Sequence, residues 1–146
     1  IKDFMDNFVS LMRNELKKES ITLDFSTVPA YHRVAADPRA LHHVLLNILS
    51  NAMDALKETK DKKIEIITGN KSGKIWLIVK VNGKGFNENQ LKHLFKPFYT
   101  TKADGTGLGL VIVKKILTRM KGEIEIESSE NAGTTVSISL PEAGSE

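Results

Sequence analysis

The sequence has no cysteine, few aromatic residues and only a small excess of positive charge. Its 146 residues include one Trp, two Tyr and six Phe, and the formal net charge is +3. Without cysteine, neither a disulfide framework nor a thiolate metal site can form. A nucleic-acid-binding surface would concentrate lysines beside aromatic residues, whereas the lysines here are scattered. We therefore expect no nucleic-acid partner.

Long apolar runs are also missing. No segment reaches the roughly 20 apolar residues that are needed to cross a bilayer, and no signal-peptide pattern opens the chain. We therefore expect a segment without membrane contact. The 40% of residues that are hydrophobic are enough for one domain with a sizeable core.

Apolar residues at three- and four-residue steps predict helices. Asp37 and Pro38 supply an N-cap and a proline at the first helical position of one helix, and Gly122 is placed to end another. Asn87 and Gln90 resemble a capping box. The predicted helices span residues 1–18, 37–59, 87–95 and 110–120, the third being short.

Alternating apolar and polar residues predict about five strands. The segment GNKSG joins two of them as a hairpin, and residues 130–133 join two others. Because strands come partly as adjacent hairpins, we expect an α/β (α+β) sandwich: a mixed, largely antiparallel sheet with three main helices on one face. The predicted strands span residues 21–28, 63–68, 74–81, 122–128 and 134–140.

A row of polar side chains follows the apolar stripe of the second predicted helix. At about 100° per residue, Asn47, Asn51 and Asp54 lie along one edge. One interpretation is a polar boundary that contacts a neighbouring loop. The other is a side-chain oxygen offered to Mg²⁺, which commonly takes one protein oxygen together with waters and phosphate oxygens.

Two glycine-containing segments raise a similar choice. In VNGKGF, Gly83 and Gly85 follow a strand and allow either an ordinary tight turn or the close approach of another group. In GTGLGL, three glycines run directly into a predicted helix, whose first amides and positive dipole end favour an anion. No G-K-[ST] follows, and the spacing is not that of a dinucleotide fingerprint.

Taken together, five segments resemble the N, G1, F, G2 and G3 boxes of the ATP-binding catalytic domain of sensor histidine kinases, in order and approximate spacing. That domain forms a superfamily with gyrase, Hsp90 and MutL ATPases. The resemblance implies a Bergerat-type fold, ATP and Mg²⁺ as cofactors, and a division into a connecting helix (1–20), the ATP-binding domain (21–141) and a tail (142–146). The segments are NILSNAMDA, NGKGF, LFKPFYTTK, GTGLGL and AGTTVSISLP.

The resemblance also implies a role for each matching residue. Asn51 would ligate Mg²⁺, the catalytic Asn47 would lie near the γ-phosphate, and Asp54 would face the nucleotide. Phe95 and Phe98 would anchor a lid. The remaining ATP-binding candidates are Gly83 and Gly85 at the base and ribose, Tyr99 against the nucleotide, Thr100, Thr101, Lys102, Gly105, Thr106, Gly107, Leu108 and Gly109 at the phosphates, and Thr134 or Thr135 near the adenine, with Thr135 taken as the candidate.

Val81 departs from the pattern. Relatives have an aspartate here, whose carboxylate accepts a hydrogen bond from the adenine amino group, and valine offers no acceptor. We expect ATP affinity to be lowered by about 10- to 200-fold, adenine selectivity most of all. Because the other boxes are intact, a recent or engineered substitution is favoured over loss in a degenerate domain; a water or a backbone carbonyl could also read the adenine.

Asn47 bears on the type of reaction. Hydrolytic members of the superfamily have a glutamate at this position, and an amide cannot act as a general base. The resemblance therefore implies phosphoryl transfer to a histidine on a separate dimerisation domain of the same kinase. No His-Glu pair occurs in the sequence, so we expect the acceptor outside this chain.

A response regulator would act downstream, and the segment would be cytoplasmic, either alone or as part of a membrane-bound sensor. Two alternatives remain: a nucleotide-silent interaction domain of the same fold, and a serine kinase of the anti-sigma-factor type. Saturable Mg-ATP binding would exclude the first alternative. Transfer to a partner's serine would indicate the second.

Overall fold

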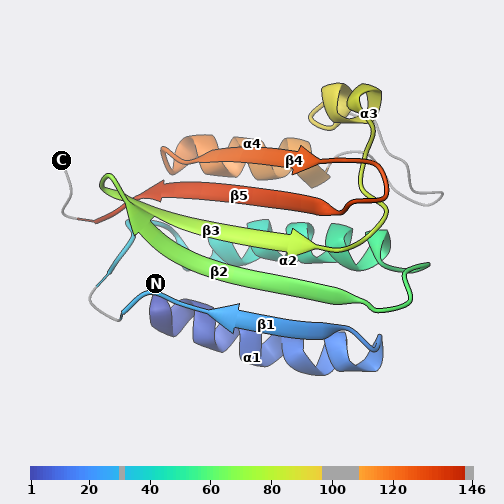
Figure 1. The fold of residues 1–146 in the computed structure, drawn as a ribbon. Helices are drawn as coiled ribbons and strands as arrows, with labels where there is room; N and C mark the ends of the chain where they lie inside the picture. Colours follow the sequence, from blue (N-terminus) through green and yellow to red (C-terminus); the bar gives the residue numbers. More distant parts are fainter. Residues whose placement is uncertain (30–31, 97–108, 144–146) are drawn as a thin grey trace.

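In the computed structural model, which describes residues 1–29, 32–96 and 109–143, five strands form one sheet. Their order is β1-β2-β3-β5-β4; β1 runs parallel to β2, and every other neighbouring pair is antiparallel (Figure 1). The predicted mixed, largely antiparallel sheet is confirmed. The strands are β1 (Thr22–Ser26), β2 (Lys63–Lys71), β3 (Lys74–Val81), β4 (Glu123–Ser128) and β5 (Thr134–Pro141).

Three longer helices form a second layer on one face of the sheet, and a fourth helix is short (Figure 1). Asp37 caps α2 by accepting a hydrogen bond from the backbone N–H of Arg39, with Pro38 in the first turn as predicted. Asn87 and Gln90 form the predicted capping box of the short helix. The helices are α1 (Lys2–Lys18), α2 (Pro38–Ala55), α3 (Glu88–His93) and α4 (Gly109–Arg119).

Helix α2 ends earlier than predicted, at Ala55 rather than near Thr59. From Leu56 onward the backbone amides bond three residues back instead of four: Leu56 N–H to the Met53 carbonyl at 3.2 Å, and Thr59 N–H to the Leu56 carbonyl at 2.9 Å. Such bonds tighten the last turn of a helix and then end it. Leu56 is fully buried, so its side chain stays in the core while the backbone turns away.

The core lies between the two layers. Along β2 and β3 every second side chain is buried, including Ile64, Ile66, Leu77 and Val79, which are all at most 2% exposed. Side chains of α1, α2 and α4 belong to the same cluster. This alternation confirms that the three main helices cover one face, because a strand points successive side chains to opposite faces.

The β2–β3 hairpin fixes which residue β3 presents at its far end. Ser72 and Gly73 both have positive φ, at 54° and 74°, as a two-residue turn between twisted strands requires. The resulting register pairs Lys71 with Lys74 and continues without a bulge to Ile64 and Val81. The Val81 side chain therefore lies on the face of the sheet that the helices cover.

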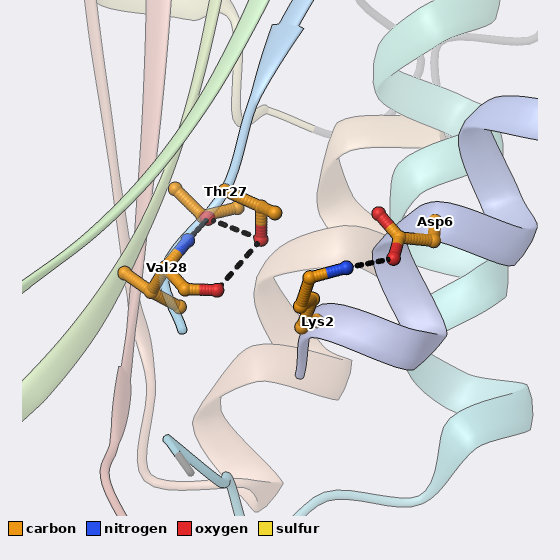
Figure 2. Close-up of polar contacts among 5 residues, drawn as sticks. Lys2, Asp6, Thr27 and Val28 are labelled. Carbon is orange, nitrogen blue, oxygen red and sulfur yellow. Dashed lines mark hydrogen bonds and ion pairs between the residues drawn. The ribbon is translucent and has the colours of Figure 1, made fainter. Parts of the chain in front are cut away.

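Polar groups near the other end of the sheet are satisfied locally. Buried Thr68 accepts a hydrogen bond from the Val28 N–H at 2.8 Å and donates to Thr27 Oγ1 at 2.9 Å. Figure 2 shows Thr27 and Val28 and, on α1, the ion pair between Lys2 and Asp6. The Lys2 Nζ and Asp6 Oδ2 atoms lie 2.5 Å apart. The hydrogen bond to Asp6 raises the pKa of Lys2.

The two neighbouring leucines of α2 give a test of this layer arrangement. Leu45 is 2% exposed and Leu46 is 39% exposed. We expect Leu45→Ala to lower the free energy of unfolding by about 2–5 kcal/mol, because it leaves a cavity in the core. Leu46→Ala, the matched control, should change it by less than about 1 kcal/mol. Urea unfolding followed by circular dichroism measures both, and equal losses would contradict the orientation of α2.

Candidate functional site

Asn47 of α2 and Gly109 of α4 lie side by side, although they are far apart in the sequence. The Nδ2 group of Asn47 donates to the His43 carbonyl at 3.1 Å. Its Oδ1 atom would lie 3.2 Å from a Cβ atom built on Gly109, the first residue of α4. An amide oxygen therefore stands where the positive end of a helix begins.

The rest of the predicted polar row continues along the same edge of α2. Asn51 and Asp54 are half-buried, and each has an interaction partner. One partner of Asp54 is Lys57, whose Nζ atom lies 3.4 Å from Asp54 Oδ1. From Asn47 to Asp54 the helix rises about 10 Å. The row is long enough to follow an elongated ligand from one end to the other.

The loop that follows β3 packs against the end of this row. A Cβ atom on Gly83 would lie 2.6 Å from the Ala55 carbonyl oxygen, at the last residue of α2. Gly85 has a φ of +68°, and a Cβ atom there would collide with the Ser129 carbonyl oxygen in the β4–β5 turn. The group that comes close to both glycines is thus the protein's own backbone.

Hydrogen bonds hold this loop to the β4–β5 hairpin. The Asn131 N–H donates to the Lys84 carbonyl at 2.6 Å, and the Phe86 N–H donates to Ser128 Oγ at 2.8 Å. Ser128 was not singled out from the sequence. Its position in GEIEIES, in step with Ile124 and Ile126, was the signal that it faces inward.

Asn82 is a second polar residue that was not singled out from the sequence. Its Oδ1 accepts from the Lys63 N–H at 2.8 Å, and its Nδ2 donates to the Asp61 carbonyl at 2.5 Å. The first residue after β3 is therefore tied to the first residue of β2. This bond pair fixes where the loop leaves the sheet.

Val81 and Thr134 form a registered pair between β3 and β5. Val81 is 7% exposed and Thr134 is half-buried. Because successive strand residues alternate between faces, Thr135 shares the opposite face with Lys80 and Glu127 instead. The register thus brings Thr134, and not the candidate Thr135, to the side of the sheet that holds Val81.

Eight of the predicted site residues lie outside the described residues, so their part of the site stays a prediction, as does the role of Phe98. Within GTGLGL the structure describes Gly109 and Leu110. The eight are Tyr99, Thr100, Thr101, Lys102, Gly105, Thr106, Gly107 and Leu108.

Two hollows border this region. One of about 480 Å³ runs beside Asn47 along the exposed side of α2 and is bordered by His43, Leu46 and Ser50. The other, of about 430 Å³, lies at the Val81 end of the sheet and includes residues of the outer face such as Lys80. The described residues contain no group of three His, Asp or Glu side chains that could hold a metal ion.

Across residues 1–29, 32–96 and 109–143, no helix is both long enough and apolar enough to span a bilayer.

The sequence of the chain matches that of a known protein family. The sequence profile described as histidine kinase-, DNA gyrase B- and HSP90-like ATPase matches residues 36–144. Sensor histidine kinase ZraS of Salmonella typhimurium is 35% identical over 143 residues, which cover 97% of this chain and 30% of ZraS. The chain thus spans less than a third of the length of this relative.

Solved structures agree with the sequence comparison. The nucleotide-free catalytic domain of histidine kinase ThkA superposes with a TM-score of 0.84 at 32% identity, covering 97% of this chain and 91% of that domain. ThkA in complex with the response regulator protein TrrA matches with a TM-score of 0.81 at 28% identity, over 98% of this chain and 40% of that one.

The contact between Gly85 and the β4–β5 turn can be tested through stability. We expect Gly85→Ala to lower the free energy of unfolding by more than about 1 kcal/mol, because alanine resists a positive φ and its Cβ would strike the Ser129 carbonyl. Gly69→Ala in β2, where a Cβ meets nothing within 4 Å, is the matched control and should be neutral or stabilising. Urea unfolding compares them; an equally neutral Gly85→Ala would show that the loop does not pack this way.

Proposed function

Because the chain belongs to the histidine kinase-, DNA gyrase B- and HSP90-like ATPase family, we propose that it holds Mg-ATP for phosphoryl transfer to a histidine on a separate dimerisation domain. It is the ATP-binding catalytic domain of a histidine kinase, as its sensor-kinase relatives and the ThkA domain indicate. The parts of this function that we propose are the bound Mg²⁺, the histidine acceptor and its location on a separate domain.

The observation that carries the proposal is the meeting of Asn47 with the start of α4. The Asn47 side chain lies beside the start of α4, whose first amides suit the anionic oxygens of phosphate. Asn47 would thus lie near the γ-phosphate of a bound magnesium–phosphate chain. Because position 109 is a glycine, the Asn47 side chain can lie close to the start of α4 without meeting a side chain there.

The described residues fit such a ligand along the row on α2. Asn51, one turn beyond Asn47, would supply the side-chain oxygen to Mg²⁺, which needs few protein ligands when phosphates and water complete its shell. Asp54, Val81 and Thr134 would then surround the base end, where the loop containing Gly83 meets the end of α2. When bound, Mg-ATP supplies the γ-phosphoryl group.

Asn47 also favours transfer over hydrolysis. A carboxamide has no titratable carboxylate and cannot take a proton from water at neutral pH. The nucleophile would therefore be supplied by a partner domain, and a response regulator would receive the phosphoryl group next. The structure of ThkA with TrrA supports a partner of that class. We place this domain in the cytoplasm, where ATP and such a regulator are available.

The valine at position 81 supports one competing function. A buried valine gives the adenine amino group no acceptor, which favours a nucleotide-silent interaction domain of the same fold. Titration with Mg-ATP separates the two functions: saturable binding supports the kinase domain, and no binding even by Val81→Asp supports the silent domain. Transfer to a partner's serine instead of histidine would reveal a serine kinase.

Restoring an acceptor at position 81 tests the account of this residue. We expect Val81→Asp to bind a fluorescent ATP analogue at least about tenfold more tightly, because a carboxylate can accept the amino-group hydrogen bond. Val81→Ala, which removes volume without adding an acceptor, should show no such gain. Equal affinity of Val81→Asp and the parent chain would contradict this role of position 81.

Removing the proposed magnesium ligand tests the other end of the site. We expect Asn51→Ala to weaken ATP binding in Mg²⁺ by at least about tenfold and to leave binding in EDTA unchanged, because the lost oxygen acts through the metal. Asn7→Ala, an exposed asparagine on α1, is the matched control. Calorimetric titration with and without Mg²⁺ gives both constants, and a loss of equal size in EDTA would assign Asn51 a different role.

A further inference from the structure

Ser128 lies at the centre of a hydrogen-bond network at the Val81 end of the sheet. Its Oγ accepts from the Phe86 N–H at 2.8 Å and donates to the Gly133 carbonyl at 2.9 Å. The same atom lies 2.8 Å from Thr134 Oγ1. One hydroxyl thus joins the loop after β3, the β4–β5 turn and the first side chain of β5.

The number of protons on the Ser128 hydroxyl determines which residue donates in the hydrogen bond between Ser128 and Thr134. A serine hydroxyl has one proton and two lone pairs. The Gly133 carbonyl can only accept, so the Ser128 proton goes to it. The hydrogen bond between the two hydroxyls must therefore use the proton of Thr134, and Ser128 accepts it together with the Phe86 N–H. Thr134 is left without a free proton and with its lone pairs available.

Thr134 consequently presents an acceptor on the face of the sheet where Val81 presents none. The two residues are a registered pair, and Thr134 is only half-buried. The exocyclic amino group of adenine is a donor, whereas a purine with a carbonyl at the same carbon offers an acceptor that an oxygen lone pair would repel.

We propose that Ser128 is a positioning residue that holds the Thr134 hydroxyl as an acceptor, and that Thr134 thereby selects a 6-amino purine over a 6-oxo purine. This inference rests on the proposed ATP binding. It identifies an acceptor for the base in a chain that has valine in place of the carboxylate. A neutral hydroxyl accepts more weakly than a carboxylate, so Val81→Asp is still expected to tighten binding.

The backbone around the network keeps it in place. A Cβ atom on Gly133 would collide with the Val81 carbonyl oxygen, and a Cβ atom on Gly85 would lie 3.0 Å from both Ser128 Oγ and the Gly133 carbonyl oxygen. The main chains of β3, the loop and the turn therefore meet with no side chains between them. Ser128 has little freedom to exchange its partners while these contacts hold.

The experiment measures base selectivity with Mg-ATP and Mg-ITP as probes, in which a carbonyl of ITP replaces the amino group. Competition against a fluorescent nucleotide gives both affinities for the same chain. We expect the parent chain to prefer ATP by about tenfold. Thr134→Val, which keeps the shape and removes the hydroxyl, should lower that ratio to near 1, and Thr134→Ser should retain it.

Ser128→Ala should lower the ratio to within about threefold, because Thr134 can then turn its proton toward the ligand. Loss of stability alone would weaken both nucleotides equally and leave the ratio unchanged. Thr135→Val, on the opposite face, and Ser129→Ala, which lies in the same turn and bonds through its backbone, are matched controls and should retain the parent ratio. If Ser128→Ala does not fold, the two Thr134 variants decide the question.

Two results would overturn the inference. ATP binding with no preference over ITP, or with a preference that Thr134→Val leaves intact, would remove Thr134 as the acceptor while the proposed function stands. Failure of the parent chain to bind either nucleotide saturably would overturn the inference and the proposed function together.

Discussion

The site depends on the direct contact of three main-chain segments at one end of the sheet. The loop after β3 lies between the last residue of α2 and the β4–β5 turn, and each contact is made at a glycine: Gly83 on Ala55, Gly85 on Ser129 and Gly133 on Val81. A side chain at any of the three would push the segments apart. Because these contacts join the helix layer to the sheet, they place the polar row of α2 against the end of β3.

Helix α2 both packs in the core and carries the polar row at the edge of its buried surface. Its apolar stripe is buried against the sheet and α4, which orients the helix, and that orientation brings the adjacent polar row to the boundary. Asn47 then faces the first residue of α4, where an amide oxygen and a helix N-terminus offer complementary partners to a metal-bound phosphate. At the other end the base would meet neutral groups, Val81 and Thr134, whose contributions are smaller than that of a carboxylate.

Much of the fold could be predicted because it depends on local patterns. The Asp37-Pro38 start of α2, the capping box at Asn87 and the hairpin before Lys74 follow from the residue types at those positions. The end of α2 could not be predicted, since the residues after Ala55 suit a helix and only the burial of Leu56 and the approach of Gly83 turn the chain away. The choice between Thr134 and Thr135 required the register of β5, which a sequence pattern leaves open by one residue.

The sequence by itself determined which chemical groups this protein can offer: amide oxygens at Asn47 and Asn51, glycines before α4, and no acceptor at position 81. It also determined the period of each helix and strand, because apolar spacing is a local property. Only the tertiary structure decided which of these groups lie close together. The meeting of Asn47 with Gly109 and the proton direction from Thr134 to Ser128 join residues from different elements, and these pairings depend on how the layers pack and on strand register.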